Sequence, residues 1–264
     1  MPAAPNEPVL LRRDDGPVAI LTLNRPHAMN ALSGELIDAL KAEFDRLAAD
    51  TSIRCVILEG TGRAFSTGHD LREVASSDDR AIHHDLLTRC SAMMLSINRL
   101  PQPVIAKVQA IATAAGCQLV AACDLAIAST EATFATSGIN NGLFCGTPSV
   151  AVGRNVGKKR ALDMLFTGQF VDAATALRDG LLSRVVSADR LDAETLALAR
   201  HIAAQPPRQI AEGKAMFHKH MEMNLVDAYA HATDFMADAL QQEDAQAGID
   251  AFVNKKPKPD WKGR

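Results

Sequence analysis

The segment from Pro103 to Ser129 limits the possible folds more than any other part of this chain. It reads as an apolar strand, a turn of small residues, the start of a helix and a second apolar strand. Parallel strands need a crossover connection, usually a helix, so this order favours an α/β fold. The small residues Ala114-Ala115-Gly116 stand where the chain turns from strand into helix, as a tight turn requires.

The same alternation of strands and helices extends over most of the chain. Val18 to Leu23 and Cys55 to Leu58 are apolar runs of strand length, and Ser33 is a suitable helix N-cap. Two helices with apolar stripes are expected, and strands recur as far as Leu181 to Val186. The stripes comprise Leu36, Leu40, Phe44 and Leu47 in the first helix, and Leu86, Cys90, Met93, Ile97 and Leu100 in the second.

The last quarter of the chain has a different pattern. From Asp189 onward no strand pattern is present, and the helices expected there are interrupted at Pro206-Pro207, because proline disrupts a helix interior. We therefore predict two regions, a core over residues 1–195 and a helical region over residues 196–264.

Composition narrows the class of protein. With 264 residues, of which 47% are hydrophobic, the chain can bury a substantial core. A net charge of -3 does not suggest a nucleic-acid-binding protein, and no apolar run approaches the ~20 residues of a membrane-spanning helix. The five cysteines include no CxxC pair, so we expect reduced thiols, no metal site and a cytoplasmic setting. Met1 to Pro8 has no targeting pattern and is expected to be a loose end.

Several short sequence motifs follow one another along the chain. They are Leu23-Asn24-Arg25-Pro26, Asn30-Ala31-Leu32, Phe65 to Leu71, Pro103 to Ser129, Phe166-Thr167-Gly168, Gly180-Leu181 and Ala251-Phe252-Val253. In this order they resemble the enoyl-CoA hydratase/isomerase (crotonase) superfamily, from about Val9 to Trp261. A stretch from Phe134 to Cys145 is similar to a narrower branch, that of enoyl-CoA hydratase domain-containing protein 3.

The resemblance implies an α/β fold in which repeated ββα units wind into a superhelix. It also implies that the helical C-terminal region packs subunits into a homotrimer or a hexamer. The expected ligand is an acyl-CoA thioester, with coenzyme A as part of the substrate and no separate cofactor. No nucleotide-binding GxGxxG motif is present.

The resemblance places two backbone N–H donors at the thioester oxygen, those of His69 and Ala115. Such a donor is worth roughly 3–4 kcal/mol in the transition state. Ala115 replaces a family glycine, and its amide is retained provided that its φ is negative. The His69 imidazole is left for another role, either as an acid or base or as a space-filling group. Asp70 is expected to cap the helix that follows.

Six residues are expected near coenzyme A by the same resemblance. Arginine suits phosphate because its guanidinium can donate two parallel hydrogen bonds. The two arginines occupy family positions near the nucleotide, and the other residues form the loop beside the thioester. The set is Arg25, Ser66, Thr67, Gly68, Asp70 and Arg72.

Both glutamates of the family's hydratases are missing. Gln118 and Gly138 stand in their places, and neither can move a proton as a carboxylate does. One alternative is that Asn140, Asn141, Cys145 or His69 supplies the acid and base; ordinary packing is the simpler reading for Cys145, and a turn for the asparagines. The other is that the site performs different chemistry or none. By analogy with relatives that build naphthoate rings, Thr136 and Gly138 could frame a bicarbonate niche.

The sequence thus predicts a crotonase-type protein that binds an acyl-CoA thioester and stabilises its enolate, with weak or absent hydratase activity. A different acyl-CoA reaction on the same scaffold is one alternative, namely isomerisation, thioester hydrolysis or decarboxylation. A non-catalytic acyl-CoA-binding protein is the other.

Overall fold

The computed structural model describes residues 7–263, so residues 1–6 of the expected N-terminal loose end lie outside it. Its main sheet has six strands in the order β1-β2-β3-β5-β7-β10. The first pair is antiparallel and the remaining pairs are parallel. The strands are β1 (Leu10–Asp15), β2 (Val18–Leu23), β3 (Cys55–Gly60), β5 (Val104–Val108), β7 (Leu125–Ser129) and β10 (Arg184–Val186).

A second sheet of four short strands, in the order β4-β6-β8-β9, carries the residues of interest. Its first three strands are parallel, and β9 closes it in antiparallel pairing. The bounds are β4 (Ala64–Ser66), β6 (Ile111–Thr113), β8 (Thr133–Ala135) and β9 (Val171–Asp172). Strands this short leave no periodicity to detect, so none of these four strands was expected from the sequence.

Helices cover the sheets, and the two predicted apolar stripes are buried in the core. Ser33 caps α1 as predicted, because its hydroxyl accepts a hydrogen bond from the Leu36 amide at 3.3 Å. The α-helices of the core are α1 (Gly34–Ala49), α2 (Leu71–Val74), α3 (Arg80–Arg99), α4 (Ala115–Ala122), α5 (Gly146–Asn155), α6 (Lys158–Thr167) and α7 (Ala173–Arg178). Short 3-10 helices are η1 (Pro26–Ala28), η2 (Ser137–Asn141) and η3 (Ala188–Arg190).

Two strand assignments differ from the sequence prediction. β1 was not expected, since its sequence LLRRDD has no apolar alternation; it is an edge strand whose charged side chains reach solvent. The strand expected over Leu181 to Val186 covers only Arg184–Val186. Leu181 and Leu182 are buried in the main core instead, after the turn at Gly180.

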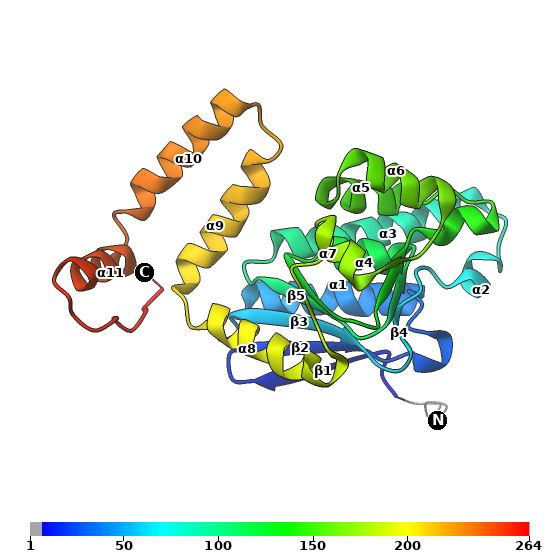
Figure 1. Ribbon diagram of the computed structural model, residues 1–264, viewed down its shortest axis with the longest axis horizontal. Coiled ribbons are helices and arrows are strands. Elements are labelled where there is room, and N and C mark those ends of the chain that lie inside the picture. The colour runs from blue at the N-terminus through cyan, green and yellow to red at the C-terminus, as the bar shows by residue number, and fades with distance from the viewer. Residues whose placement is uncertain (1–6, 264) are drawn as a thin grey trace.

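The chain ends in a helical arm that projects from the core (Figure 1). It consists of α9 (Pro207–His220), α10 (Leu225–Ala239) and α11 (Glu243–Val253). The preceding helix, α8 (Leu191–Ala203), instead buries Leu191, Ala199 and Ala203 against the main sheet. The division expected between residues 195 and 196 therefore falls inside α8, while the break expected at Pro206-Pro207 coincides with the start of the arm. No helix among the described residues has the length and apolar character needed to cross a membrane.

One buried ion pair ties the arm to the core. The Lys214 ammonium on α9 donates to Asp124 Oδ2 at 2.6 Å and to the carbonyls of Ile97 and Gln102 at 2.8 and 3.0 Å. The same carboxylate oxygen accepts the Val104 amide at 2.7 Å, at the start of β5. Only 7% of the Lys214 side chain is exposed, so α9 is held through a desolvated charge.

Candidate active site

The loop between β4 and α2 is held against the segment before α1. Leu32 and His69 form a parallel bridge, in which Leu32 N–H donates to the Gly68 carbonyl at 2.7 Å and Asp70 N–H donates to the Leu32 carbonyl at 3.2 Å. In such a bridge the neighbours of His69 make the bonds, so its own N–H points to the other side. That amide is therefore not used by the bridge, and its role as a donor to a thioester oxygen stays a prediction.

The helix across the loop is α4, and two glycines allow their close contact. A Cβ on Gly68 would lie 2.9 Å from the Ala115 nitrogen, and one on Gly116 would lie 2.1 Å from the Ser66 carbonyl oxygen. Gly68 also has φ 87°, which disfavours any residue with a side chain. The segments that bear the two predicted donors thus lie against each other.

The N-terminus of α4 is buried and has no side-chain cap. Ala115 is its first residue, so its N–H has no acceptor within the helix, and the helix dipole adds partial positive charge there. Its φ is not positive, which meets the condition set for a usable donor. The glycine-like conformation lies one residue earlier, at Ala114, with φ 51° and ψ -123°, and costs of order 1–3 kcal/mol.

The His69 side chain is partly buried, and its Nε2 atom is inaccessible to solvent and has no hydrogen-bond partner. Burial lowers its pKa, although the nearby Glu73 carboxylate opposes that shift. The ring is therefore neutral at physiological pH, since its ordinary value is about 6.5.

The two positions that lack glutamates have different surroundings. Gln118, on α4, is 5% exposed, and its Oε1 has no hydrogen-bond partner. At Gly138 an added Cβ would lie 2.6 Å from the Leu143 carbonyl oxygen and 2.7 Å from Cys145 Sγ. The space into which a side chain at residue 138 would grow is occupied by this chain's own atoms, which also argues against bicarbonate in that direction.

The proposed substitutes for the glutamates are engaged elsewhere. Asn140 is exposed and donates to the Gly168 carbonyl at 3.3 Å, on the turn after α6. Cys145 accepts the Gly138 amide at 3.2 Å, and burial raises the pKa of its thiol despite that hydrogen bond. A thiol with a raised pKa is a poor nucleophile, so packing explains Cys145 best.

The residues expected near coenzyme A divide into those with intramolecular partners and one without. Arg25 donates to Asp70 at 2.9 Å and to the Ala31 carbonyl at 2.5 Å. Burial acts to raise the pKa of Asp70, but the hydrogen bonds from Arg25 and the Arg72 amide outweigh it and hold that pKa below its ordinary value. Asp70 also caps α2, as predicted, by accepting the Arg72 amide at 3.1 Å.

Three further members of that set belong to the loop itself. The Ser66 hydroxyl donates to the Asn30 carbonyl at 2.8 Å and accepts the Gly68 amide at 3.3 Å, while Thr67 donates to the Met29 carbonyl at 3.4 Å. Within residues 7–263, no hydrogen bond or ion pair engages the Arg72 side chain, which is exposed. The contacts of all six residues with coenzyme A stay predictions.

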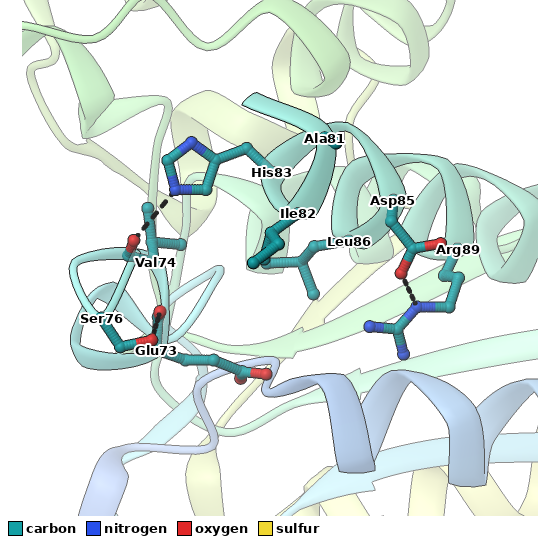
Figure 2. Close-up of a pocket in the computed structure, with 9 residues that line it drawn as sticks. All are labelled: Glu73, Val74, Ser76, Ala81, Ile82, His83, Asp85, Leu86 and Arg89. Carbon is teal, nitrogen blue, oxygen red and sulfur yellow. Dashed lines mark hydrogen bonds and ion pairs between the residues drawn. The ribbon is translucent and has the colours of Figure 1, made fainter. Parts of the chain in front are cut away.

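A cavity of about 440 Å³ lies between α2 and α3 (Figure 2). The residues predicted from the sequence do not line it, but Glu73, which acts on His69, does. Glu73 also accepts the Gly34 amide at 2.9 Å, at the start of α1. Glu73 was not predicted from the sequence, because a single acidic residue on a short helix gives no sign that it will lie near His69. The lining is Glu73, Val74, Ser76, Ala81, Ile82, His83, Asp85, Leu86 and Arg89.

Known proteins resemble this chain over almost its whole length. Residues 13–264 match the family model described as enoyl-CoA hydratase/isomerase. The chain belongs to the crotonase family. A crystal structure of an enoyl-CoA hydratase from Mycobacterium smegmatis superposes with a TM-score of 0.94 at 49% identity, covering 96% of this chain and 99% of that one.

The narrower branch expected from the sequence is also confirmed. Mouse enoyl-CoA hydratase domain-containing protein 3 is 43% identical over 95% of this chain and 83% of its own length. The crystal structure of the human protein of that name has a TM-score of 0.92 at 40% identity, over 95% of this chain and 99% of that one. These matches confirm the predicted α/β crotonase fold.

The expected cytoplasmic setting is wrong. The cytoplasmic setting rested on the lack of a targeting pattern in Met1 to Pro8 and on five unpaired cysteines. The mouse, rat and human relatives are instead named as mitochondrial proteins. Reduced thiols fit more than one compartment, so cysteine usage could not decide between them.

Proposed function

We propose that this crotonase-family protein binds an acyl-CoA thioester and stabilises negative charge on its carbonyl oxygen through the amides of His69 and Ala115. The observation that carries this proposal is the contact between the Gly68 loop and the uncapped N-terminus of α4. A buried, uncapped helix end is a ready site for a developing oxyanion, because its N–H groups have no other acceptor.

Hydration of an enoyl-CoA by this site is weak or absent in our proposal. Gln118 can hold a water but cannot take its proton, and Gly138 has no side chain. The neutral His69, the thiol Cys145 and the exposed Asn140 offer no paired acid and base. Isomerisation, thioester hydrolysis, decarboxylation and acyl-CoA binding without turnover remain alternatives on the same oxyanion site.

For coenzyme A, we propose Arg72 as the phosphate contact in place of Arg25. Arg25 is 15% exposed and already paired with Asp70, whereas the Arg72 side chain is exposed and without a partner among the described residues. We propose that Arg25 shapes the loop instead.

Calorimetric titration with butyryl-CoA and its carbonyl-free thioether, S-butyl-CoA, tests the oxyanion site in the unmodified protein. The thioester should bind at least about ten-fold more tightly, because only it offers an acceptor to the two amides. Equal affinities would refute the proposed site. An Ala114→Gly/Ala115→Pro variant removes one donor, since proline is accepted at the first helical position but lacks an N–H. Its control is Ala114→Gly, and thermal melting checks that both fold.

A further inference from the structure

Three hydrogen bonds join the segment at the start of α1 to the loop before α2 and to α2 itself. The Leu32 amide donates to the Gly68 carbonyl at 2.7 Å, and the Asp70 amide donates to the Leu32 carbonyl at 3.2 Å. The third bond lies two residues further along, where the Gly34 amide donates to Glu73 Oε2 at 2.9 Å. Of these three bonds, only the third uses a side chain, so a substitution at Glu73 can remove it without changing the other two.

The place of Glu73 in α2 would ordinarily give its carboxylate a partner in its own helix. Asp70 is the N-cap of α2 and Glu73 is the third residue of that helix. A glutamate in this position usually accepts the backbone amide of the N-cap residue, in the arrangement called a capping box. In this chain the Asp70 amide donates to the Leu32 carbonyl instead. The Glu73 carboxylate is thus left to bind a donor on another helix, α1.

Gly34 is the first residue of α1, and it is a glycine because space is short there. Its φ is not positive, so the backbone conformation alone does not require glycine. A Cβ on residue 34 would lie 2.8 Å from Glu73 Oε1 and 3.3 Å from Arg89 Nη2. The Gly34 amide has no acceptor within its own helix, and the partial positive charge at that helix end favours a carboxylate. The glycine therefore keeps open the place that Glu73 occupies.

The bond to Gly34 matters for the site because α2 directly follows the loop that carries His69. A helix of four residues is not stable by itself, so α2 depends on its neighbours. His83 Nε2, on α3, lies 3.0 Å from the Val74 carbonyl at the end of α2. On the other side, the Glu73 side chain extends from α2 toward α1 (Figure 2). The cavity of about 440 Å³ beside α2 leaves room for this helix to shift if that bond is lost.

We propose that Glu73 is a positioning residue of the candidate active site. By accepting the Gly34 amide, it fixes α2 against α1 and so keeps the His69 amide directed at the thioester oxygen. Glu73 itself moves no proton in this role. The inference rests on the proposed function, because the position of the His69 amide matters to a ligand only if that amide is a donor.

Calorimetry with butyryl-CoA and S-butyl-CoA measures this role as the ratio of the two affinities. Glu73→Ala should lower the ratio from about ten-fold to about three-fold or less, whereas Glu73→Gln, which retains an acceptor oxygen, should keep most of it. Gly34→Ala should lower the ratio as well, because its Cβ displaces the Glu73 carboxylate, although alanine is the better helix former. The matched control is Asp85→Ala, which removes another carboxylate from the cavity lining and leaves the bond to Gly34 in place.

Hydrogen–deuterium exchange tests the same bond in the protein without ligand. Peptides covering residues 66–74 should exchange faster in Glu73→Ala and Gly34→Ala than in the wild type or in Asp85→Ala, because local opening of a segment governs its exchange. Thermal melting checks that each variant folds. Unchanged exchange in Glu73→Ala would overturn the inference.

The two ligands also separate this inference from the proposed function. A wild type that prefers the thioester, beside a Glu73→Ala variant with the same preference, would refute the role of Glu73 and leave the oxyanion proposal standing. If the wild type does not distinguish the thioester from the thioether, the oxyanion proposal fails and the role of Glu73 in positioning a donor fails with it.

Discussion

At the scale of single residues, the site depends on atoms that are absent as much as on those present. Gly68 and Gly116 have no Cβ, and this lets a loop and a helix end meet at van der Waals distance. The family resemblance identified these positions, but only the structure shows that the Gly116 Cβ would overlap the Ser66 carbonyl. Gly138 differs from these two glycines. The space that a side chain at residue 138 would need is already filled by atoms of Leu143 and Cys145.

Restoring a glutamate at residue 138 should therefore destabilise the protein rather than revive hydration. The new Cβ would lie 2.6 Å from a backbone oxygen that cannot move independently. Overpacking of this kind costs roughly 1–3 kcal/mol, so Gly138→Glu should melt several degrees lower and hydrate crotonyl-CoA no faster. Gly146→Glu, at an exposed position where an added Cβ meets nothing within 4 Å, is the matched control. A Gly138→Glu variant with wild-type melting and new hydratase activity would contradict this account.

Stability should fall below about pH 6.5 in a manner that depends on His69. Burial lowers its pKa in the folded protein, while the unfolded chain titrates near 6.5. As pH falls through that value, the unfolded state gains a proton that the folded state does not, so folding is disfavoured. Urea unfolding at pH 7 and pH 5 should show a smaller loss in His69→Gln than in the wild type. Identical losses in the two proteins would disprove the role given to this imidazole.

At the scale of elements, α9 connects the core to the arm through Lys214. Its ammonium donates to the Ile97 carbonyl near the end of α3, to the Gln102 carbonyl just before β5 and to the Asp124 carboxylate. Burial lowers the pKa of Lys214, although Asp124 opposes that shift. His218, one turn later, lies 3.4 Å from the second oxygen of the same carboxylate. Elements far apart in sequence are thus joined at a single carboxylate.

Lys214→Ala should lower the free energy of unfolding by about 3–5 kcal/mol, because it leaves a buried carboxylate without its cation. Lys219→Ala, an exposed position on the same helix, should have little effect. Guanidinium unfolding measures both, and limited proteolysis reports whether the arm loosens first. Equal stabilities in the two variants would show that the pair contributes little to folding.

At the scale of the whole molecule, the arm exposes large apolar side chains that the core does not cover. Many large apolar side chains left exposed on one segment are typical of an interface. These residues are Phe217, Met221, Leu225, Val226, Tyr229, Met236, Leu240, Ile249, Phe252 and Val253.

We expect a trimer or a hexamer in solution, assembled through this arm. Sedimentation velocity should give a mass several times that of the 28.2 kDa chain. Val226→Glu, on an α10 side chain that is 78% exposed, should shift the protein to smaller species. Leu11→Glu, on the edge strand β1, should not. A wild-type protein that sediments as a monomer would refute this assembly.

Features that depend on local periodicity could be predicted from the sequence alone. The strands β2, β3, β5 and β7, the cap at Ser33 and the two buried stripes follow from apolar spacing along one stretch of chain. The sequence motifs around Gly68 and Gly116 helped to identify the family, because close backbone contact admits only small residues there.

Features that depend on residues distant in sequence could be seen only in the folded protein. The pairing of Arg25 with Asp70, the filling of the space beside Gly138 by Cys145 and Leu143, and the coupling of His69 to Glu73 arise from packing in three dimensions. Periodicity describes which face of an element is buried, whereas the chemistry of a site depends on which faces meet.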